Sequence, residues 1–297
     1  MSHPTSYRVT PLIDPERGPA GHRLAWLAAD ADGSPAGSAF LRLFTAAGQQ
    51  HLAELAINVH PTERRRGAGS RLLDAAVTAA RADSRRCVIA QAREGQPGDH
   101  FLAARGFRRV MTLTYARLAL AEADPAALDS LVEAPHPGYR LISWDGTVPD
   151  ELAETFTASR SAMDDMPMEG TDFGRVVWDV DRVRAAAAAV ARRGELLETV
   201  AAVHAASGEI VGFTELVVPA GGVGDAQHYG TGVLPEHRGR GLAVWMKAES
   251  IRRARERHPE LAGLLTDTAG DNPSMRSIND GLGYRATHRT FEYQLDL

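Results

Sequence analysis

The sequence predicts two consecutive α/β domains. The main observation is a segment that occurs once in each half of the chain: an apolar strand, a proline, a loop rich in arginine and glycine, and a helix. The loops span residues 64–69 and 238–243, each beginning three residues after a proline, and both fit R-x-x-G-x-G/A. A length of 297 residues suits two domains of ordinary size.

Both loops are typical of phosphate binding. Successive backbone N–H groups in such a turn point inward, and the helix that follows adds the positive end of its dipole. A Rossmann G-x-G-x-x-G motif is excluded because Leu72 stands where the third glycine would be, and a Walker P-loop is excluded because neither copy contains G-K-[ST]. We therefore predict a duplicated nucleotide-binding domain that holds a pyrophosphate.

The composition limits the class of protein. Hydrophobic residues make up 44% and charged residues 24% of the chain, so each half can build a core, and the net charge of −5 argues against nucleic-acid or membrane partners. We expect no signal peptide and no membrane span. Cys87 is the only cysteine, which excludes an internal disulfide and predicts a cytoplasmic protein. Because Cys87 lies in an apolar stretch, we predict that its thiol is buried.

The first half is predicted to be mostly strands. Apolar patterns bounded by turn residues predict strands at 7–13, 23–29, 39–45, 52–59, 88–92 and 110–118. Helices are expected at 69–82, behind the first loop, and at 100–105. Prolines and a glycine in residues 121–138 predict a linker with one or two helical turns.

The second half repeats this order with an insertion. Strands are predicted at 139–143, 197–204, 210–218, 227–234, 264–268 and 290–295, and helices at 241–257 and 273–281. Two further helices, at 149–163 and 179–193, have no counterpart in the first half. The predicted division is therefore a first domain at 1–120, a linker at 121–138 and a second domain at 139–297.

The order of elements and both loops resemble the GNAT acyltransferase superfamily, in a tandem arrangement like that of mycothiol synthase. The resemblance is strongest at residues 59–69, 233–243 and 272–284. It implies an α/β fold (α+β, with a mixed sheet) made of two tandem GNAT-like acyl-CoA N-acyltransferase domains. It also implies acetyl-CoA as the acyl donor, and the absence of metal-ligand spacing in the sequence predicts no metal.

The resemblance assigns the cofactor-binding residues. In the family, the loop binds the pyrophosphate of acetyl-CoA, and the strand before it pairs with the pantetheine. Carried over here, the main chain of Thr231 and Val233 would hold the pantetheine and the thioester carbonyl, and Asn272 would bond the cofactor's amides or a nearby backbone group. The residues of the two loops are Arg238, Gly239, Arg240, Gly241, Leu242 and Ala243 in the second half, and Arg64, Arg65, Arg66, Gly67, Ala68 and Gly69 in the first.

One position departs from the family pattern. Residues 272–284 resemble N-x-x-[AM]-x-x-x-Y-x-x-x-G-[FY], in which the tyrosine is the general acid for the thiolate, but Asn279 occupies that place. A thiol has a pKa of about 8.5, so the thiolate can leave without a dedicated acid. In the first half, Gly95 and Leu102 replace the asparagine and the tyrosine. We therefore predict that the first domain is degenerate and that the second domain catalyses.

Transfer to an amine also needs a base, because an alkylammonium has a pKa of about 10. Glu215, an acid in an apolar strand beside the cofactor strand, is the first candidate, with a solvated edge residue as the alternative reading. His228 and Tyr229 on the cofactor strand come next, with packing roles as their alternative. An acidic cluster between the extra helices would attract a cationic amine, unless it is a solvated loop. This cluster consists of Asp164, Asp165 and Glu169.

These observations predict an N-acetyltransferase that moves an acetyl group directly from acetyl-CoA to a primary amine of a small molecule, in a ternary complex. The alternatives are a non-catalytic acyl-CoA-binding or sensing protein, and an acyltransferase with a protein acceptor or a longer acyl donor. The chain is expected to be a monomer with an internal pseudo-dimer, or a homodimer. No histidine spacing suggests a metal site, and no Ser-His-Asp arrangement is evident.

Overall fold

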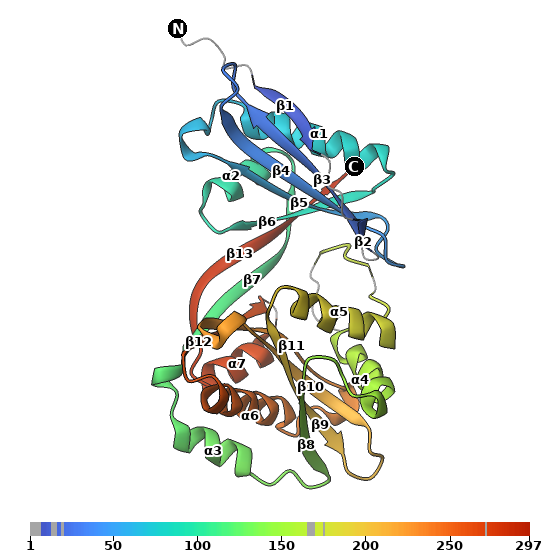
Figure 1. The fold of residues 1–297 in the computed structure, drawn as a ribbon, viewed down its shortest axis with the longest axis vertical. Helices are drawn as coiled ribbons and strands as arrows, with labels where there is room; N and C mark the ends of the chain where they lie inside the picture. The colour runs from blue at the N-terminus through green and yellow to red at the C-terminus, as the bar shows by residue number, and fades with distance from the viewer. Residues whose placement is uncertain (1–6, 13–16, 19–20, 165–169, 175, 271) are drawn as a thin grey trace. The chain divides into compact units, whose positions relative to one another are not determined.

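The computed structural model describes residues 7–12, 17–18, 21–164, 170–174, 176–270 and 272–297 (Figure 1). The chain forms two compact units, each assembled from separate stretches. Unit 1 comprises Met1–Thr112, Met168–Val177 and Arg289–Leu297, and unit 2 comprises Leu113–Pro167 and Trp178–His288. Both are α/β with a mixed sheet, which confirms the predicted fold class. No helix in the described part is long and apolar enough to cross a membrane.

In unit 1, the sheet has the strand order β1-β3-β4-β5-β6-β13, with the short β2 on β3. Its strands are β1 (Arg8–Leu12), β2 (Arg17–Gly18), β3 (Gly21–Ala29), β4 (Pro35–Phe44), β5 (Leu52–Val59), β6 (Cys87–Arg93) and the second part of β13 (Arg285–Asp296). All neighbours are antiparallel except β5 and β6. The 3₁₀ turn η1 (Pro61–Glu63) and the helix α1 (Ala68–Ala82) follow β5, and α2 (Pro97–Ala104) follows β6. Helix α1 packs on β3, β4 and β5.

Unit 2 repeats this topology with the strand order β7-β12-β11-β10-β9-β8. Its strands are the second part of β7 (Arg108–Ala119), then β8 (Tyr139–Asp145), β9 (Leu196–His204), β10 (Ile210–Val218), β11 (Gly224–Val233) and β12 (Leu261–Ala269). Only β11 and β12 are parallel. The helices and 3₁₀ turns are η2 (Leu120–Glu122), α3 (Pro125–Glu133), η3 (Asp150–Leu152), α4 (Ala153–Ser159), η4 (Arg160–Met163), α5 (Val180–Arg192), η5 (Ala220–Gly222), η6 (Pro235–His237), α6 (Leu242–Arg257) and α7 (Pro273–Gly281).

The helices of unit 2 cover both faces of its sheet. On β9, Ala201 and Val203 face the core under α4 and α5, whereas the alternate residues Val200 and Ala202 face the core under α6. The two extra helices predicted from the sequence are therefore present, although the first is divided into η3, α4 and η4. Together they form a layer opposite α6.

The closing strand of each unit comes from the other half of the chain. In unit 1, β13 pairs with β6 from Thr290 to Asp296, and in unit 2, β7 pairs with β12 from Leu113 to Ala119. The division expected from the sequence places β7 in the first domain and β13 in the second. The contacts instead place the paired part of β7 in unit 2 and the paired part of β13 in unit 1. An apolar pattern marks which face of a strand is buried, but it does not mark the neighbour with which the strand pairs.

Residues 121–138, expected to form a linker, are packed in unit 2. Helix α3 is capped by the Asp124 side chain and lies against α6. The indole N–H of Trp245 on α6 donates to the Val132 carbonyl at 2.8 Å, and the His136 ring stacks on Trp245 with centroids 4.1 Å apart. The segment thus continues the core of unit 2 over the outer side of α6.

Candidate functional site

Each unit contains one pair of parallel strands that separates along its length. In unit 2 the pairing of β11 with β12 ends at Gln227 and Leu265, and in unit 1 the pairing of β5 with β6 ends at Leu55 and Ala90. In both cases the strands continue beyond the last pair. Since the facing edges no longer bond each other there, their N–H and C=O groups are available to an extended ligand.

The two glycine loops lie where the separated strands end. Gly67 and Gly241 each stand directly before the first residue of a helix. The backbone of both glycines lies in the left-handed region, with φ of 101° and 76°. The Arg64 side chain donates to the Val59 carbonyl at 3.1 Å, and Arg238 donates to the Val233 carbonyl at 2.9 Å. Both arginines therefore fold back and fix the loop to its strand.

The free amides of the second loop begin after Arg238. The Arg238 N–H donates to the Pro235 carbonyl at 3.2 Å, and the first bond along α6 is from Trp245 to Gly241 at 3.0 Å. The first N–H groups of a helix have no partner within it, so the amides between these two bonds can hold an anion. A Cβ added at Gly241 would meet the His136 ring at 3.3 Å.

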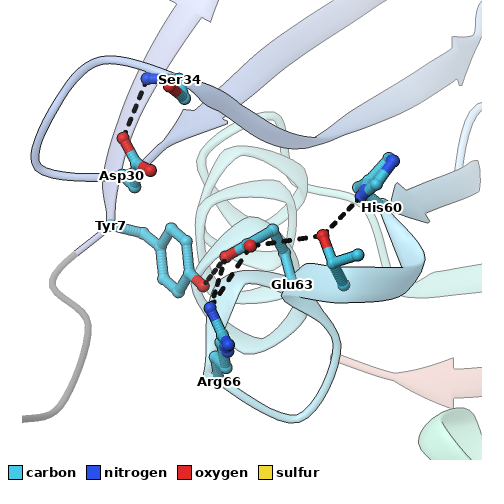
Figure 2. A network of polar contacts seen from close by, with 7 residues as sticks. Tyr7, Asp30, Ser34, His60, Glu63 and Arg66 are labelled. Atoms are coloured by element: carbon cyan, nitrogen blue, oxygen red, sulfur yellow. Dashed lines mark hydrogen bonds and ion pairs between the residues drawn. The ribbon is translucent and has the colours of Figure 1, made fainter.

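A tyrosine at the start of the outermost strand of each unit bonds the 3₁₀ turn that leads into its loop. In unit 1 the Tyr7 hydroxyl donates to Glu63 at 2.7 Å, and Arg66 pairs with the same carboxylate at 3.3 Å (Figure 2). In unit 2, Tyr139 bonds His237 at 2.9 Å. Arg66 is therefore held in the loop's own network.

A pocket of about 600 Å³ opens at the separated strands of unit 1. Its wall includes loop residues Arg64, Arg65 and Gly67, together with Phe101 and Arg105 from the region of α2. The pocket is lined by both apolar side chains and guanidinium groups. It suits a long ligand that has an anionic end.

A buried polar cluster lies on the α6 side of the strand gap in unit 2. It is made of Lys247 from α6, His228 from β11, Asn279 from α7 and Tyr284, which follows α7. Each is at most 5% exposed. Both ring nitrogens of His228, Oδ1 of Asn279 and the hydroxyl of Tyr284 have no hydrogen bond of normal geometry within the described residues. Buried polar groups without partners are rare, so this cluster calls for a ligand.

Burial controls the protonation of this cluster. Burial lowers the pKa of Lys247 to about 7, opposed by the carboxylate of Asp267. Burial and then the Lys247 charge lower the pKa of His228 well below its usual value, against a smaller opposite effect of the Glu215 backbone. Burial also raises the pKa of Tyr284. At neutral pH, His228 and Tyr284 are therefore uncharged, and Lys247 is close to the midpoint of its titration.

Unit 1 has apolar residues at the matching positions. Two members of the cluster are matched by counting from the aligned loops, allowing for the extra residue Tyr229 in the β10–β11 register, and the other two by aligning Gly283-Tyr284 with Gly106-Phe107. The matching core residues of unit 1 are Leu73 for Lys247, Leu55 for His228, Leu102 for Asn279 and Phe107 for Tyr284. The fold thus forms with a fully apolar set at these positions, and the polar set in unit 2 is not needed for folding.

Glu215 lies on the other face of the sheet, held in a buried ion pair. Both of its carboxylate oxygens accept from Arg160 of η4, at 2.9 and 2.5 Å. The Arg160 guanidinium also packs 4.6–4.8 Å from the ring centroids of Phe156, Trp178 and Phe213. With both oxygens engaged, Glu215 anchors η4 to β10.

Three further predicted site residues, Tyr229, Asn279 and Asn272, already have hydrogen-bond partners within the protein. Tyr229 is 54% exposed, and its hydroxyl accepts from Arg193 at 2.7 Å. Asn279 donates to the Thr268 hydroxyl at 3.0 Å. The Asn272 side chain accepts from the Met275 N–H at 3.0 Å and so caps α7, which is the backbone bond allowed for in its predicted role.

The acidic cluster is described only in part. Asp164 follows η4 with an exposed side chain, whereas Asp165 and Glu169 lie outside the described residues. On β11, Gly230 and Gly232 let η4 approach closely, since added Cβ atoms would meet Met163 at 3.5 Å and Ala162 at 3.0 Å. The segment that ends at Asp164 is therefore held against the strand that borders the gap.

Sequence reasoning missed Arg160 and Lys247. A signal existed for the second residue, since Lys247 is the only lysine in the chain and is placed within a helix behind a glycine loop. Arg160 has no such signal among the many arginines. The partners of both residues are distant in sequence, so only folding brings them together.

One group of possible metal ligands occurs in unit 1. The ligand atoms of His51, Cys87 and Asp172 all lie within 4.8 Å of one another. His51 Nε2 already lies 2.9 Å from the Asp172 carbonyl oxygen and 3.2 Å from its carboxylate. Burial, followed by the charge of Asp172, raises the pKa of the Cys87 thiol to about 11, so the thiol stays protonated. A metal ion would have to displace this proton in order to bind the Cys87 sulfur.

The chain matches the model of the acetyltransferase (GNAT) family at residues 3–107 and 168–284. It is similar to a tandem GNAT protein from the clavulanic acid biosynthesis pathway, solved without AcCoA, with 26% identity, a TM-score of 0.75, and coverage of 94% of this chain and 84% of that one. A GCN5-related N-acetyltransferase from Sphaerobacter thermophilus gives 16% identity, a TM-score of 0.67, and coverage of 92% and 80%. A GCN5-related N-acetyltransferase from Kribbella flavida gives 18% identity, a TM-score of 0.56, and coverage of 87% of each chain. Among curated protein sequences, none matches this chain.

Proposed function

The chain belongs to the acetyltransferase (GNAT) family, and on this premise we propose that unit 2 transfers an acetyl group from acetyl-CoA to a primary amine of a small molecule. The observation that carries the proposal is the combination of a strand gap, a glycine loop and a buried polar cluster in unit 2. Unit 1 has the first two features and an apolar core in place of the third. Acyl transfer needs polar groups at the reacting end, so the difference supports catalysis in unit 2.

The residues of unit 2 suit acetyl-CoA, which supplies the acyl group as a thioester. The amides from Gly239 onward would bind the pyrophosphate at the N-terminus of α6. The main chain of Thr231 and Val233, on the part of β11 that β12 leaves unpaired, would hold the pantetheine and polarise the thioester carbonyl. The ligand would thus run from the loop toward the point where the two strands meet.

The acceptor would approach from the face covered by α4, η4 and α5. Glu215 and Arg160 fix η4 there, and the acidic residues that follow η4, Asp164 with Asp165 and Glu169, would attract a cationic amine. The 26% identical tandem GNAT protein of the clavulanic acid pathway supports a metabolite as the acceptor. A protein acceptor would need a longer open surface on this face.

For the base, the hydrogen-bond partners favour His228 over Glu215, although Glu215 lies on the acceptor face and His228 on the α6 face, so the amine would have to reach the His228 ring through the strand gap. His228 is neutral at physiological pH and has ring nitrogens without partners, whereas Arg160 occupies both oxygens of Glu215. Tyr229 remains the third candidate. His228→Gln should lower kcat on the order of 100-fold or more if the ring accepts the proton of the amine, and Glu215 would remain the base if that variant keeps full activity.

Two matched glycine variants test the assignment of the units. Gly241→Val places a side chain where the pyrophosphate must approach and strains a backbone with φ of 76°, and Gly67→Val does the same in unit 1. Release of free thiol from acetyl-CoA, measured with a panel of amines, should fall strongly for Gly241→Val. A larger fall of kcat for Gly67→Val, in a folded protein, would assign catalysis to unit 1.

The pocket of unit 1 supports a second, non-catalytic role. Its arginine-lined wall and its volume of about 600 Å³ suit a bound CoA that stabilises the unit. Thermal shift with acyl-CoAs of increasing chain length should then show two binding sites in the wild type. Gly67→Val should lose one site and retain turnover. If CoA binds but no amine yields free thiol, the chain would be an acyl-CoA-binding protein.

A further inference from the structure

The only lysine of the chain is buried beside the point where the cofactor strands separate. Lys247 is 1% exposed, and the charge that acts on its ammonium is the carboxylate of Asp267 on β12. Its Nζ lies 5.1 Å from the centroid of the Tyr284 ring. A buried ammonium is costly, and buried titratable groups with shifted pKa values are concentrated at functional sites.

Lys247 is also close to both strands that border the gap. Its positive charge opposes protonation of His228, the first residue of β11 after the last pair with β12, and it favours ionisation of Asp267 on β12. The Lys247 ammonium is therefore within electrostatic range of both edges of the gap, at the end of the gap that lies away from the glycine loop. Under the proposed function, the sulfur of CoA would lie at this end.

On this evidence, which rests on the proposed function, we propose that Lys247 is the general acid that protonates the leaving thiolate of CoA. Nζ of Lys247 would take over the task of the tyrosine that Asn279 replaces. Asn279 has no titratable proton, and its amide is already bonded to Thr268. The matching residue of unit 1, Leu73, cannot supply a proton, in agreement with a non-catalytic unit 1.

The step balances as follows. The amine nitrogen of the acceptor forms a bond to the acyl carbon as the carbon–sulfur bond breaks, and the sulfur leaves with the electron pair. Lys247 Nζ gives one proton to the sulfur and becomes a neutral amine. The proton that the acceptor loses passes to the base and returns to Nζ by way of the solvent. The CoA thiolate, whose conjugate thiol has a pKa of about 8.5, is a stronger base than this buried amine, so the proton transfer is favourable.

The surroundings of Lys247 limit what else could titrate with it. His228 of β11, Asp267 of β12 and Tyr284 after α7 are the ionisable groups that surround Lys247 in the described structure. The other elements against the middle of α6 present apolar side chains: Val200 and Ala202 of β9, Val211, Leu216 and Val218 of β10, and Leu128 and Leu131 of α3. Glu198 of β9 and Asp145 of β8 pair with Arg257 at the C-terminal end of α6. A titration near neutral pH at this site thus reports on Lys247.

A single lysine makes a direct test possible. Protein grown with ¹³C-labelled lysine should give one side-chain NMR signal, with a midpoint near pH 7 in the free protein. Above the pKa of the thiol, about 8.5, the CoA complex should keep more of the ammonium form than the complex with desulfo-CoA, which lacks only the thiol, because a nearby thiolate favours the ammonium. Identical titration curves in the two complexes would overturn the proposal. If neither ligand binds, as judged by thermal shift, both the acetyl-CoA site and this proposal fail.

Kinetics supply the second test, with a matched control in unit 1. Lys247→Met should lower kcat on the order of 100-fold, leave KM for acetyl-CoA within a few-fold, and abolish the fall of kcat at alkaline pH. Leu73→Met at the equivalent position should keep the wild-type rate and pH profile. Unchanged kcat in Lys247→Met, or an acetyl group found on Lys247 by intact mass after turnover, would overturn the proposal. Should Lys247→Met fail to fold, the NMR comparison on wild-type protein decides.

Discussion

A buried lysine should lower the stability of the fold in a pH-dependent way. The pKa of Lys247 is about 7 in the folded protein and 10.5 for an ordinary lysine, so between these values the unfolded chain holds the proton more tightly. The contribution of Lys247 to the free energy of unfolding therefore rises with pH between these two pKa values. We predict that Lys247→Met is more stable than the wild type at pH 6, and that its advantage shrinks toward pH 10.

Urea unfolding of both proteins at several pH values measures this difference. The comparison of interest is the difference between the two curves, since groups other than His228 and Asp267, whose pKa values depend on the Lys247 charge, titrate equally in both proteins. A constant difference from pH 6 to 10 would mean that Lys247 keeps an ordinary pKa. The proposed proton transfer would then lack its physical basis.

A second prediction concerns the stability contributed by the buried ion pair of Glu215 and Arg160. Either Glu215→Leu or Arg160→Met alone leaves a buried charge without its partner and should cost about 3–5 kcal/mol in unfolding free energy. The double variant should recover most of that loss, because two apolar side chains can replace the pair.

Activity of the same double variant separates two roles of Glu215. If Glu215 only anchors η4, recovered stability should bring recovered turnover. If Glu215 is the base, the double variant should be stable yet slower on the order of 100-fold. Denaturant unfolding and the free-thiol assay, run on the same preparations, provide both readouts.

For the elements, the two loops offer a natural comparison at one backbone position. Arg65 and Gly239 are equivalent, and both lie in the left-handed region, with φ of 64° and 72°. A side chain there costs about 1–2 kcal/mol, partly offset by about 0.5–1 kcal/mol from the reduced freedom of the unfolded chain. We predict that Gly239→Ala destabilises and Arg65→Gly stabilises, each by about 0.5–1 kcal/mol.

Thermal unfolding of the two variants tests this prediction, and the melting temperatures should move in opposite directions. If Arg65→Gly were destabilising instead, the Arg65 side chain would be making contacts that outweigh its backbone strain. The pocket of unit 1 would then depend on that guanidinium even without a ligand.

For the whole molecule, the strand pairing predicts which unit loses protection when the C-terminal residues are removed, because the last strand of the chain pairs in unit 1. Removing Arg289–Leu297 deletes the part of β13 that pairs with β6 of unit 1. We predict that hydrogen exchange of β6 amides accelerates strongly, because an edge of the sheet loses its partner, while β12 of unit 2 keeps its protection through β7 and β11. Loss of protection in β12 with β6 unchanged would contradict this strand pairing.

Local patterns in the sequence determined the elements and the loops. The strands at 52–59 and 210–218 and the helix at 273–281 have the predicted bounds, because alternation and helix-start signals are read within a few residues. The duplicated motif predicted two α/β units with a mixed sheet, and Asn279 and Leu102 marked how the second unit differs from the first. The resemblance to acetyltransferases rested on the same short segments.

Tertiary structure alone decided which residues meet. The ion pair of Glu215 with Arg160, the grouping of Lys247 with His228 and Tyr284, and the pairing of β13 with β6 all join residues far apart in the chain. A sequence pattern marks a side chain as buried, but it does not mark its neighbour, because contacts across a sheet depend on strand order and register. Protonation follows from those contacts, so the chemistry of Lys247 became visible only in the folded chain.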